Sequence, residues 1–308
     1  MHHNTLIVIA GPTAIGKTEL AIKVAQHFKT EIISADSRQF YKEMSIGTAK
    51  PSDDELHAVK HHFIDSHSIH ETFTVGDFET QALSMLDTIF KSNKAAVLVG
   101  GSGLFIKAVT EGFDALPKAE PELRQELNQL FEQEGILPLQ EKLQELDPIY
   151  YQGVDLNNPQ RLIRALEVSI SSGQPYSSFR TNHVQSRPFN LIKIGLNTNR
   201  ETLYNRINAR VDSMVKAGLI DEVKNLLPYK SLNALNTVGY SEIFDALDGN
   251  ASMEVAIQNI KQNTRRFAKR QLTWFRKDVT IKWFEPNETE QVLTYIFSCF
   301  KKLDNPSA

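Results

Sequence analysis

The residues best suited to chemistry form a glycine-rich loop near the start of the chain, Gly11-Pro12-Thr13-Ala14-Ile15-Gly16-Lys17-Thr18. It fits the phosphate-binding pattern G-x-x-x-x-G-K-[ST], with an apolar run before it and a helix-forming run after it. The backbone N–H groups of such a loop, the Lys17 ammonium and the positive end of the helix attract phosphate, and the Thr18 hydroxyl suits Mg2+. The loop therefore predicts a bound phosphate or diphosphate compound, with nucleotides such as ATP included.

A carboxylate is expected beside this loop. Residues 31–34 form a short apolar run that predicts a second strand of a β–α–β unit, and Asp36 follows it directly. Because open α/β sheets bind ligands at the carboxyl ends of their strands, Asp36 should lie near the phosphate. It can serve as a general base or hydrogen-bond acceptor for a substrate, or as a turn or N-cap aspartate. Its position alone leaves both roles open.

Two pairs of arginines have helical spacing. Arg206 and Arg210 lie four residues apart and suit a clamp on a diphosphate, or an exposed face paired with Glu201 or Asp212. Arg161 and Arg164 lie three residues apart in a helix that opens near Pro159, and they can reach phosphates or pair with surface acids.

A third apolar strand is predicted at residues 95–99, followed by glycines and Ser102. It lacks the terminal aspartate of a Walker B strand, which argues against a standard ATPase or GTPase. His57 and His61 have the spacing of a helical metal pair. We favour structural histidines there, because the surrounding stretch has neither cysteine ligands nor an HExxH pattern.

The strongest local charge lies at residues 261–277, which carry seven basic residues and no acid in a chain of net charge −3. This predicts a basic helix that binds a polyanion, with Phe267, Trp274 and Phe275 anchoring it in the core. The alternative is a solvated helix face.

Length and composition point to a globular protein with a sizeable core. The 308 residues suggest about two domains, or one α/β domain with an insertion. With the phosphate-binding loop and the short apolar strands, we expect an α/β fold, a P-loop NTPase-like parallel sheet flanked by helices, with an inserted all-helical subdomain. We expect the core at residues 1–116 and 189–308, and the insertion at 117–188. A lone cysteine and the lack of long apolar runs predict a cytoplasmic protein with no membrane partner.

Seven segments along the chain resemble the tRNA dimethylallyltransferase (tRNA isopentenyltransferase) family: GPTAIGKTELA, ISADSRQFYKEMSIGTAKPS, VGGSGLFIKAV, NPQRLIRALEV, GLIDEV, TVGYSEI and AKRQLTWFR. The resemblance implies transfer of a dimethylallyl group from dimethylallyl diphosphate to N6 of adenosine 37, in the anticodon stem-loop of tRNA. Asn158 and Ser102 are small departures from the family pattern, where Asp and Thr are common. The zinc-finger tail of eukaryotic members is absent, which points to a bacterial-type enzyme.

The resemblance also implies roles for individual residues. Lys17 and Thr18 would bind the diphosphate with Mg2+, Arg206 and Arg210 would add a clamp, and Asp36 would be the catalytic base. A monomer is expected. The residues implied to bind tRNA are Asp36, Ser37, Arg38, Gln39, Ser102, Arg124, Gln160, Arg161, Leu162, Ile163, Arg164, Asn236, Thr237, Val238, Gly239, Tyr240 and Ser241. The charge of the basic stretch adds Arg265, Arg266 and Arg270 as predicted RNA contacts, if they face RNA and not the core.

Three other functions remain open at this point. An adenylate dimethylallyltransferase would prenylate free nucleotides, although the helical insertion and the basic stretch favour tRNA. A small-molecule kinase would use ATP at the loop. A nucleotide-switched RNA-binding protein would bind without turnover and would not need Asp36.

Overall fold

The computed structural model describes residues 4–114, 116, 117, 120–181 and 184–304. Residues 118 and 119, near the predicted start of the insertion, lie outside the described residues. The chain divides into two compact units, one of residues 1–111 and 186–308 and the other of residues 112–185. The sequence had suggested boundaries at 117 and 188. Each unit is described below by itself.

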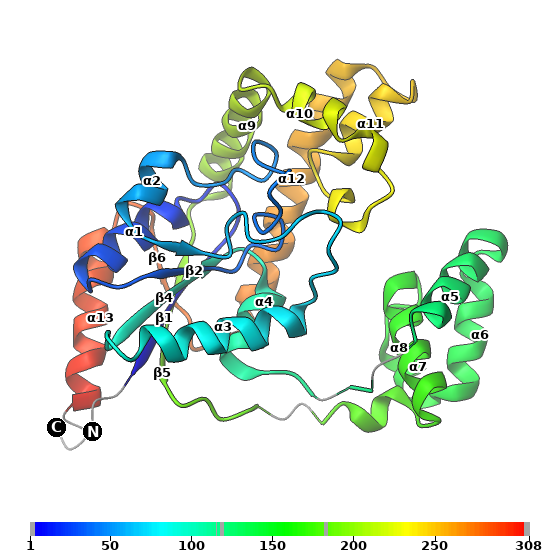
Figure 1. Cartoon of the computed structure of the whole chain (residues 1–308), viewed down its shortest axis with the longest axis horizontal. Coiled ribbons are helices and arrows are strands. Elements are labelled where there is room, and N and C mark those ends of the chain that lie inside the picture. The colour runs from blue at the N-terminus through cyan, green and yellow to red at the C-terminus, as the bar shows by residue number, and fades with distance from the viewer. Residues whose placement is uncertain (1–3, 115, 118–119, 182–183, 305–308) are drawn as a thin grey trace. The chain divides into compact units, whose positions relative to one another are not determined.

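The first unit is built on a six-stranded parallel sheet, which confirms the expected α/β class (Figure 1). The strand order is β3-β2-β4-β1-β5-β6. The strands are β1 (Thr5–Ala10), β2 (Ile32–Ser34), β3 (His61–His62), β4 (Ala95–Gly100), β5 (Asn190–Leu196) and β6 (Lys282–Phe284). His57 lies in the helix Asp53–Ala58 and His61 lies in β3, so the two histidines do not share a helix.

The helices of the first unit are α1 (Lys17–His27), α2 (Asp53–Ala58), α3 (Val75–Ile89), α4 (Gly103–Glu111), α9 (Arg200–Lys216), α10 (Leu219–Asn225), α11 (Ser241–Leu247), α12 (Met253–Phe275) and α13 (Thr289–Asp304), with short 3-10 turns at Leu227–Tyr229 and Asn233–Leu235. Several of them cover the two faces of the sheet, whereas α10 and α11 pack with α9 and α12 in a separate apolar cluster. The central strand β1 is wholly buried and alternates between two cores. Ile7 and Ile9 pack with α1 and α9, whereas Leu6 and Val8 pack with α3.

Local sequence explains where several helices begin. Thr74 accepts a hydrogen bond from the Asp77 amide, and Asp77 accepts one from the Thr74 amide, which is a capping box at the start of α3. In the second unit Asn158 caps α8 and Pro159 occupies its first position, as the sequence predicts. These caps satisfy amides that have no partner within the helix.

The second unit is entirely helical among the residues described. It contains α5 (Pro121–Glu134), α6 (Leu137–Leu146), α7 (Pro148–Gly153), α8 (Pro159–Ser172) and a 3-10 turn, Tyr176–Phe179. Leucines of α5, α6 and α8 form a core of its own. The buried Asp147 side chain accepts bonds from the amides of Tyr150 and Ser177. The unit therefore has a separate core and internal polar bonds.

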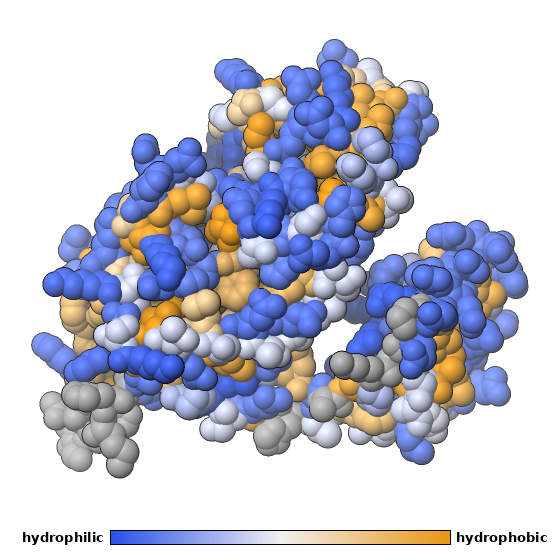
Figure 2. Space-filling view, in the orientation of Figure 1, coloured by the Kyte–Doolittle hydropathy of each residue, from blue (hydrophilic) through white to orange (hydrophobic). Residues whose placement is uncertain are grey.

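Hydrophilic residues cover most of the molecular face shown in Figure 2. Among the described residues, no helix is long and apolar enough to span a bilayer.

Candidate active site

The glycine-rich loop connects β1 to α1, as predicted. Gly11 must be a glycine, because a Cβ there would lie 2.7 Å from the carbonyl oxygen of Leu196 on the neighbouring strand. Gly16 has a positive φ of 103° and precedes the first turn of α1. Lys17 Nζ donates to the Pro12 carbonyl at 2.8 Å, so the loop curls around its own lysine.

The loop forms one wall of a cavity of about 380 Å³. Lys17, Thr18, Asp36, Arg206 and Arg210 all line it, although their positions in the chain are far apart. We call it the phosphate cavity. Three cationic side chains and one carboxylate from the predicted site therefore meet in one place, as the sequence analysis expected.

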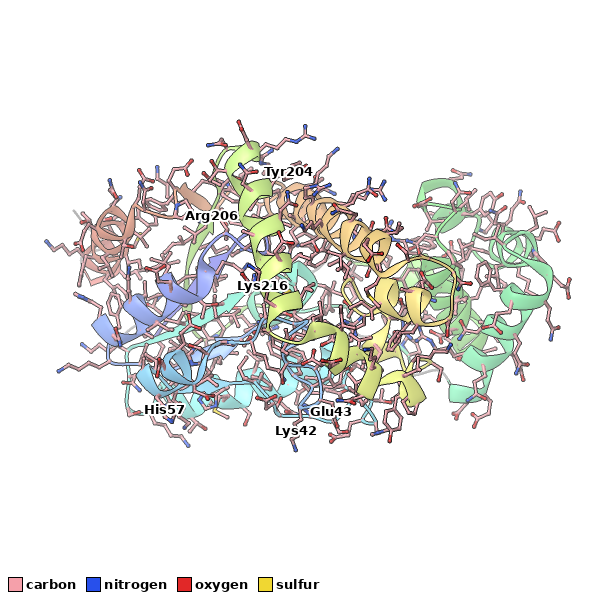
Figure 3. The ribbon with its side chains drawn as sticks, turned by 90° about the horizontal axis from the view of Figure 1, so that it is seen from above. Lys42, Glu43, His57, Tyr204, Arg206 and Lys216 are labelled. Atoms are coloured by element: carbon pink, nitrogen blue, oxygen red, sulfur yellow. The ribbon has the colours of Figure 1, made fainter. Side chains whose placement is uncertain are left out.

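Both arginines of α9 face the loop. Arg206 Nη1 donates to the Ile15 carbonyl at 3.1 Å, and Arg210 Nη1 donates to Thr13 Oγ1 at 3.3 Å. Arg206 is labelled on α9 in Figure 3, which views the helix from above. Asp212, the alternative partner, pairs with Lys261 instead. The clamp is thus formed from one face of α9.

The cavity perturbs the charge of Lys17. Its removal from water lowers the pKa of the Lys17 ammonium to about 8, the negative charge of Asp36 opposes this shift, and the positive charge of Arg210 adds to it. Burial likewise lowers the pKa of Arg210, against the pull of Asp36 and Glu55. A polyanion that entered this cavity would favour the charged forms of Lys17 and Arg210.

Asp36 follows β2 and combines the two roles left open by the sequence. One carboxylate oxygen, Oδ1, accepts from the Arg38 amide at 3.1 Å, which is a local turn. The side chain also lines the phosphate cavity and a second cavity of about 240 Å³. The turn therefore fixes the carboxylate where the two cavities meet.

Much of the wall of the second cavity is apolar. Ile207, Val211, Met214, Val238 and Ile260 line it. It shares six residues with the phosphate cavity: Thr13, Asp36, Thr48, Ala49, Arg210 and Phe267. An anion and an apolar group can therefore bind side by side with Asp36 between them.

Several predicted tRNA contacts also line the second cavity. Ser102 Oγ accepts from the Ser37 amide at 3.2 Å, which joins the ends of β4 and β2. Arg38 donates to the carbonyls of Asn233 and Asn236, each at 3.2 Å. These bonds hold the segments together, and direct contact of these side chains with RNA stays a prediction. The predicted tRNA contacts that line the second cavity, besides Asp36, are Ser37, Arg38, Ser102, Thr237, Val238 and Gly239.

Other predicted contacts have buried side chains. Tyr240 is 0% exposed, and Leu162 and Ile163 are buried in the core of the helical unit. These three side chains are held within the two cores in this structure. Gln39 is only half-buried: it donates to the carbonyls of Thr48 and Ala49 and lines the phosphate cavity, so its contact with RNA stays a prediction.

The basic stretch forms most of α12, but its aromatic residues do not behave alike. Phe275 is buried as predicted, whereas Phe267 is 38% and Trp274 is 43% exposed, so the prediction that all three anchor the helix is wrong for two of them. The buried positions 256, 260, 268, 271 and 275 follow one helical stripe, and Phe267 and Trp274 lie off it.

The charges of α12 also differ from one another. Arg265 is half-buried and donates to Asn208 Oδ1 at 2.7 Å. Arg266 and Arg270 are exposed; Arg266 donates to Asn263, and Arg270 lies over the Phe267 ring. Two of the three arginines singled out from the sequence are therefore open to a polyanion.

Sequence reasoning missed Gln271, which lies on the buried stripe of α12. Its Oε1 accepts from the Thr13 amide and its Nε2 donates to the Gly101 carbonyl, both at 2.9 Å. It thereby joins the phosphate loop to the end of β4. An amide at a core position of an amphipathic helix is the signal that could have found it.

The remaining predicted tRNA residues belong to the helical unit. Arg124 and Arg164 both pair with Glu167, at 3.5 and 3.3 Å, and Glu167 is 2% exposed. Arg124 also donates to Gln160 at 3.5 Å. One buried carboxylate, that of Glu167, thus holds both Arg124 and Arg164. Arg161, which lies on α8 with Arg164, is exposed.

Within the described parts of the chain, no group of three or more His, Cys, Asp or Glu side chains is placed to hold a metal ion. Strand β4 ends at Gly100, so the Walker B carboxylate is missing there, as the sequence indicated. A metal at this site would depend on the Thr18 hydroxyl together with oxygen ligands from a bound anion and water.

The chain is similar to known proteins over nearly its whole length. The family model described as IPP transferase matches residues 39–278. A tRNA dimethylallyltransferase of Christiangramia forsetii is 59% identical over 296 residues, which are 96% of this chain and 98% of that protein.

Two solved structures are also similar. The tRNA isopentenylpyrophosphate transferase of Bacillus halodurans has a TM-score of 0.73 and 37% identity, over 97% of each chain. A eukaryotic dimethylallyltransferase, described as acting on tRNA, has a TM-score of 0.75 and 26% identity, over 94% of this chain and 75% of that chain.

Proposed function

The chain belongs to the IPP transferase family, whose curated relatives are named tRNA dimethylallyltransferases, and we propose that it prenylates N6 of adenosine 37 in tRNA. Dimethylallyl diphosphate is the proposed donor. The single observation that carries the assignment of roles is the position of Asp36 between a cationic cavity and an apolar one. Diphosphate fits the first, and the organic parts of the two substrates fit the second.

The reaction exchanges one bond for another. The allylic C1–O bond breaks, diphosphate leaves with the electron pair, and a new bond forms between C1 and adenine N6. Lys17, Arg206, Arg210 and the loop amides stabilise the charge that develops on the leaving diphosphate. This explains a nucleotide-type loop in an enzyme that need not hydrolyse ATP.

Asp36 is the proposed general base. The exocyclic amine of adenine is a poor nucleophile, and a carboxylate that accepts its N–H bond makes it more reactive. After attack, the proton moves from N6 to the carboxylate. Because the amine is inaccessible in a stacked anticodon loop, the base must be extruded to reach Asp36. The shared wall of the two cavities gives it a place to meet the donor.

Mg2+ is part of the proposal. Thr18 lines the phosphate cavity and offers a hydroxyl, and the absence of a carboxylate cluster among the described residues agrees with an ion held mainly by diphosphate and water. When bound, Mg2+ would neutralise charge on the leaving group. Chelation of divalent cations should therefore abolish turnover, and added Mg2+ should restore it.

The proposed enzyme acts as a monomer in the cytoplasm, where tRNA is processed. Light scattering coupled to gel filtration tests the monomer, and fractionation of cells tests the location. Two or more copies per particle would contradict the first part without touching the chemistry.

Nucleoside analysis tests the function. The purified protein, dimethylallyl diphosphate and unmodified tRNA should give N6-dimethylallyl adenosine at position 37, and tRNA without the protein should not. Prenyl transfer to AMP but not to an anticodon stem-loop would favour the adenylate-modifying alternative. Phosphate transfer from ATP, without transfer from labelled dimethylallyl diphosphate, would favour a kinase.

A further inference from the structure

The loop of residues 45–50 forms a wall that both cavities share. Thr48 and Ala49 line both, Lys50 lines the phosphate cavity, and Gly47 lines the second cavity. The loop therefore helps to shape the place where the diphosphate donor is proposed to bind. Several polar bonds hold it in place.

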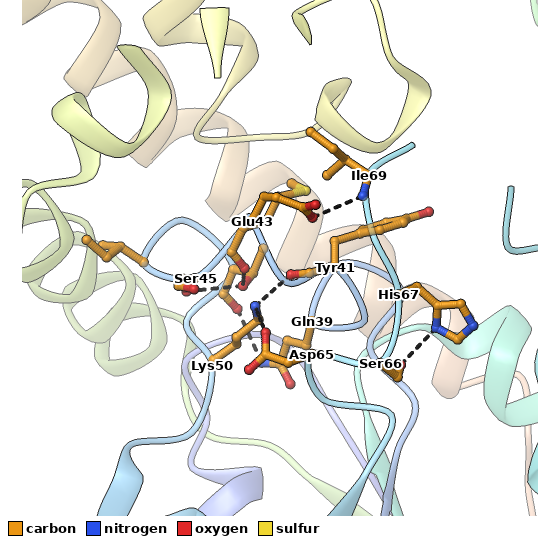
Figure 4. Close-up of polar contacts among 12 residues, drawn as sticks. Gln39, Tyr41, Glu43, Ser45, Lys50, Asp65, Ser66, His67 and Ile69 are labelled. Atoms are coloured by element: carbon orange, nitrogen blue, oxygen red, sulfur yellow. Dashed lines mark hydrogen bonds and ion pairs between the residues drawn. The ribbon is translucent and has the colours of Figure 1, made fainter. Parts of the chain in front are cut away.

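One side of the loop is held by neighbouring residues of the chain, as Figure 4 shows. Lys50 Nζ donates to the Tyr41 carbonyl at 2.6 Å and pairs with Asp65. Gln39 donates to the carbonyls of Thr48 and Ala49. These bonds hold residues 48–50 of the loop, but they leave the amides of residues 45–47 to another partner.

That partner is Glu222, on the short helix α10. Its Oε2 accepts from the amides of Ser45 at 3.1 Å and Ile46 at 2.7 Å. Its Oε1 accepts from the Gly47 amide at 3.0 Å and from the Tyr240 hydroxyl at 2.6 Å. One carboxylate thus satisfies three consecutive amides and a phenol. Charged acceptors make roughly twofold stronger hydrogen bonds than neutral ones.

Tyr240 connects the Glu222 carboxylate and the loop amides bound to it with the second cavity. Its ring packs directly on Gly47, where a Cβ would lie 2.5 Å from Cε2. Burial and the neighbouring Glu222 carboxylate raise the pKa of Tyr240, which keeps the phenol protonated as a donor. The three residues before it, Thr237–Gly239, line the second cavity. Glu222 therefore joins two segments of the cavity walls without lining either cavity itself.

We propose that Glu222 is a positioning residue that sets the shape of the 45–50 loop and thereby the affinity for the diphosphate donor. This inference rests on the proposed function only for the identity of the donor. Because Glu222 does not line either cavity, it acts through the loop. A purely structural role would instead lower thermal stability and leave the affinities of the folded protein unchanged.

Glu222→Gln tests the proposal. The amide keeps one oxygen but turns an NH2 group toward the loop amides or the phenol, so it cannot accept all four bonds. We expect the KM for dimethylallyl diphosphate and the Kd for inorganic diphosphate to rise about 10-fold or more, as loss of charge-assisted bonds implies. The KM for tRNA should change less than about 2-fold, because the exposed charges of α12 are untouched.

Two variants calibrate this result. Tyr240→Phe removes the phenol but leaves the three amide bonds, so its effect on diphosphate affinity should be several-fold smaller. Asp221→Asn removes a charge from the neighbouring position of α10, where the side chain is 80% exposed, and should change neither constant. All measurements are made well below the melting temperature of each variant.

An unchanged diphosphate Kd in folded Glu222→Gln would overturn the proposal, as would equal losses for donor and tRNA. If this variant does not fold, Gly47→Ala decides, because it displaces the loop from the Tyr240 side and should weaken diphosphate in the same way. Inorganic diphosphate binding needs no turnover. A wild-type protein that binds it but never prenylates tRNA would therefore reject the proposed function and leave Glu222 testable.

Discussion

Asp36 combines a structural and a chemical task, and one substitution separates them. In Asp36→Asn the side-chain oxygen can still accept from the Arg38 amide, so the turn should persist. We expect kcat to fall by about 10²–10⁴-fold, the usual contribution of a general base. Affinity for tRNA should stay within about twofold, since phosphate contacts dominate it.

Single-turnover assays with labelled donor give the rate, and filter binding gives the affinity. Asp36→Ala should lose at least as much activity as Asp36→Asn. It should also disturb the turn, because alanine has no oxygen to accept from the Arg38 amide. Substantial turnover by Asp36→Asn would show that the carboxylate does not take the proton.

The lowered pKa of Lys17 predicts how donor binding depends on pH. Below pH 8 the ammonium is charged in the free protein, and diphosphate binds it directly. As pH rises through about 8, the free protein loses this charge, while bound diphosphate favours the charged form. The Kd for dimethylallyl diphosphate should therefore rise up to about tenfold per pH unit above 8.

Calorimetry between pH 7 and pH 10 measures this dependence and the associated proton uptake. The ligand itself is almost fully ionised above pH 8, because a phosphate pKa of about 6 lies well below that range. Lys17→Ala should bind about 10–100-fold more weakly at pH 7, and the step near pH 8 should vanish. A step that persists in this variant would assign it to another group.

At the residue scale, the sequence was informative where a motif is local. The loop from Gly11 to Thr18 is contiguous, and Asp36 follows a strand, so both could be predicted. The partners of Gln271 and Glu222 could not, because they are distant in the chain, although an amide on the apolar face of α12 could have marked Gln271 itself. Such bonds depend on how strands and helices pack.

Helix α12 carries the next prediction, because its charges differ in exposure. Arg266→Gln with Arg270→Gln removes two exposed charges, whereas Lys261→Gln removes one that pairs with Asp212. We expect the double variant to weaken tRNA binding and to lower the slope of log K against log salt by about one per charge. Lys261→Gln should leave the slope unchanged.

Titrations of labelled anticodon stem-loop RNA at several salt concentrations provide the slopes. Equal slopes for wild type and the double variant would show that this face of α12 is only solvated. Arg265→Gln should have an intermediate effect at most, since this arginine is half-buried against Asn208.

At the scale of elements, hydrophobic periodicity predicted most strands and helices, but it did not predict where each begins or which residues face the core. The apolar runs of β1 and β4 are contiguous and buried, so they could be predicted directly. Helix α12 begins at Met253, well before the basic stretch, and its buried stripe places Phe267 on the open side. Strand β3 has two residues and pairs only because β2 lies beside it. Neither feature has a local signal.

At the scale of the whole molecule, the division into two units was predicted from composition, with boundaries at 117 and 188, whereas the structure divides at 111/112 and 185/186. Prolines and short amphipathic segments indicated the helices of the insertion. The exact junctions could not be predicted, because they depend on which residues contact each core. Residues 112–114, for example, precede the helices but contact the end of the insertion through Gln185 and Thr181.

We expect the sheet unit to bind the diphosphate and the helical unit to contribute to tRNA binding, and substitutions can test this separation. Every residue lining the phosphate cavity belongs to the sheet unit, whereas Arg124 and Arg161 belong to the helical unit. Arg124→Gln with Arg161→Gln should weaken tRNA binding about 10-fold or more through lost phosphate contacts. Affinity for inorganic diphosphate should not change, because no group in that cavity is altered.

Lys142→Gln is the matched control, since it removes an exposed charge from α6 of the same unit, at a position with no implied tRNA contact. It should leave the affinity for tRNA within about twofold, the usual scale of a lone surface charge. Equal losses for Lys142→Gln and the double variant would mean that only the net charge of the helical unit matters. Weaker diphosphate binding in the double variant would show instead that the two sites are coupled. Selective loss for tRNA alone would assign recognition of the polyanion to specific arginines of the insertion and the chemistry to the sheet unit.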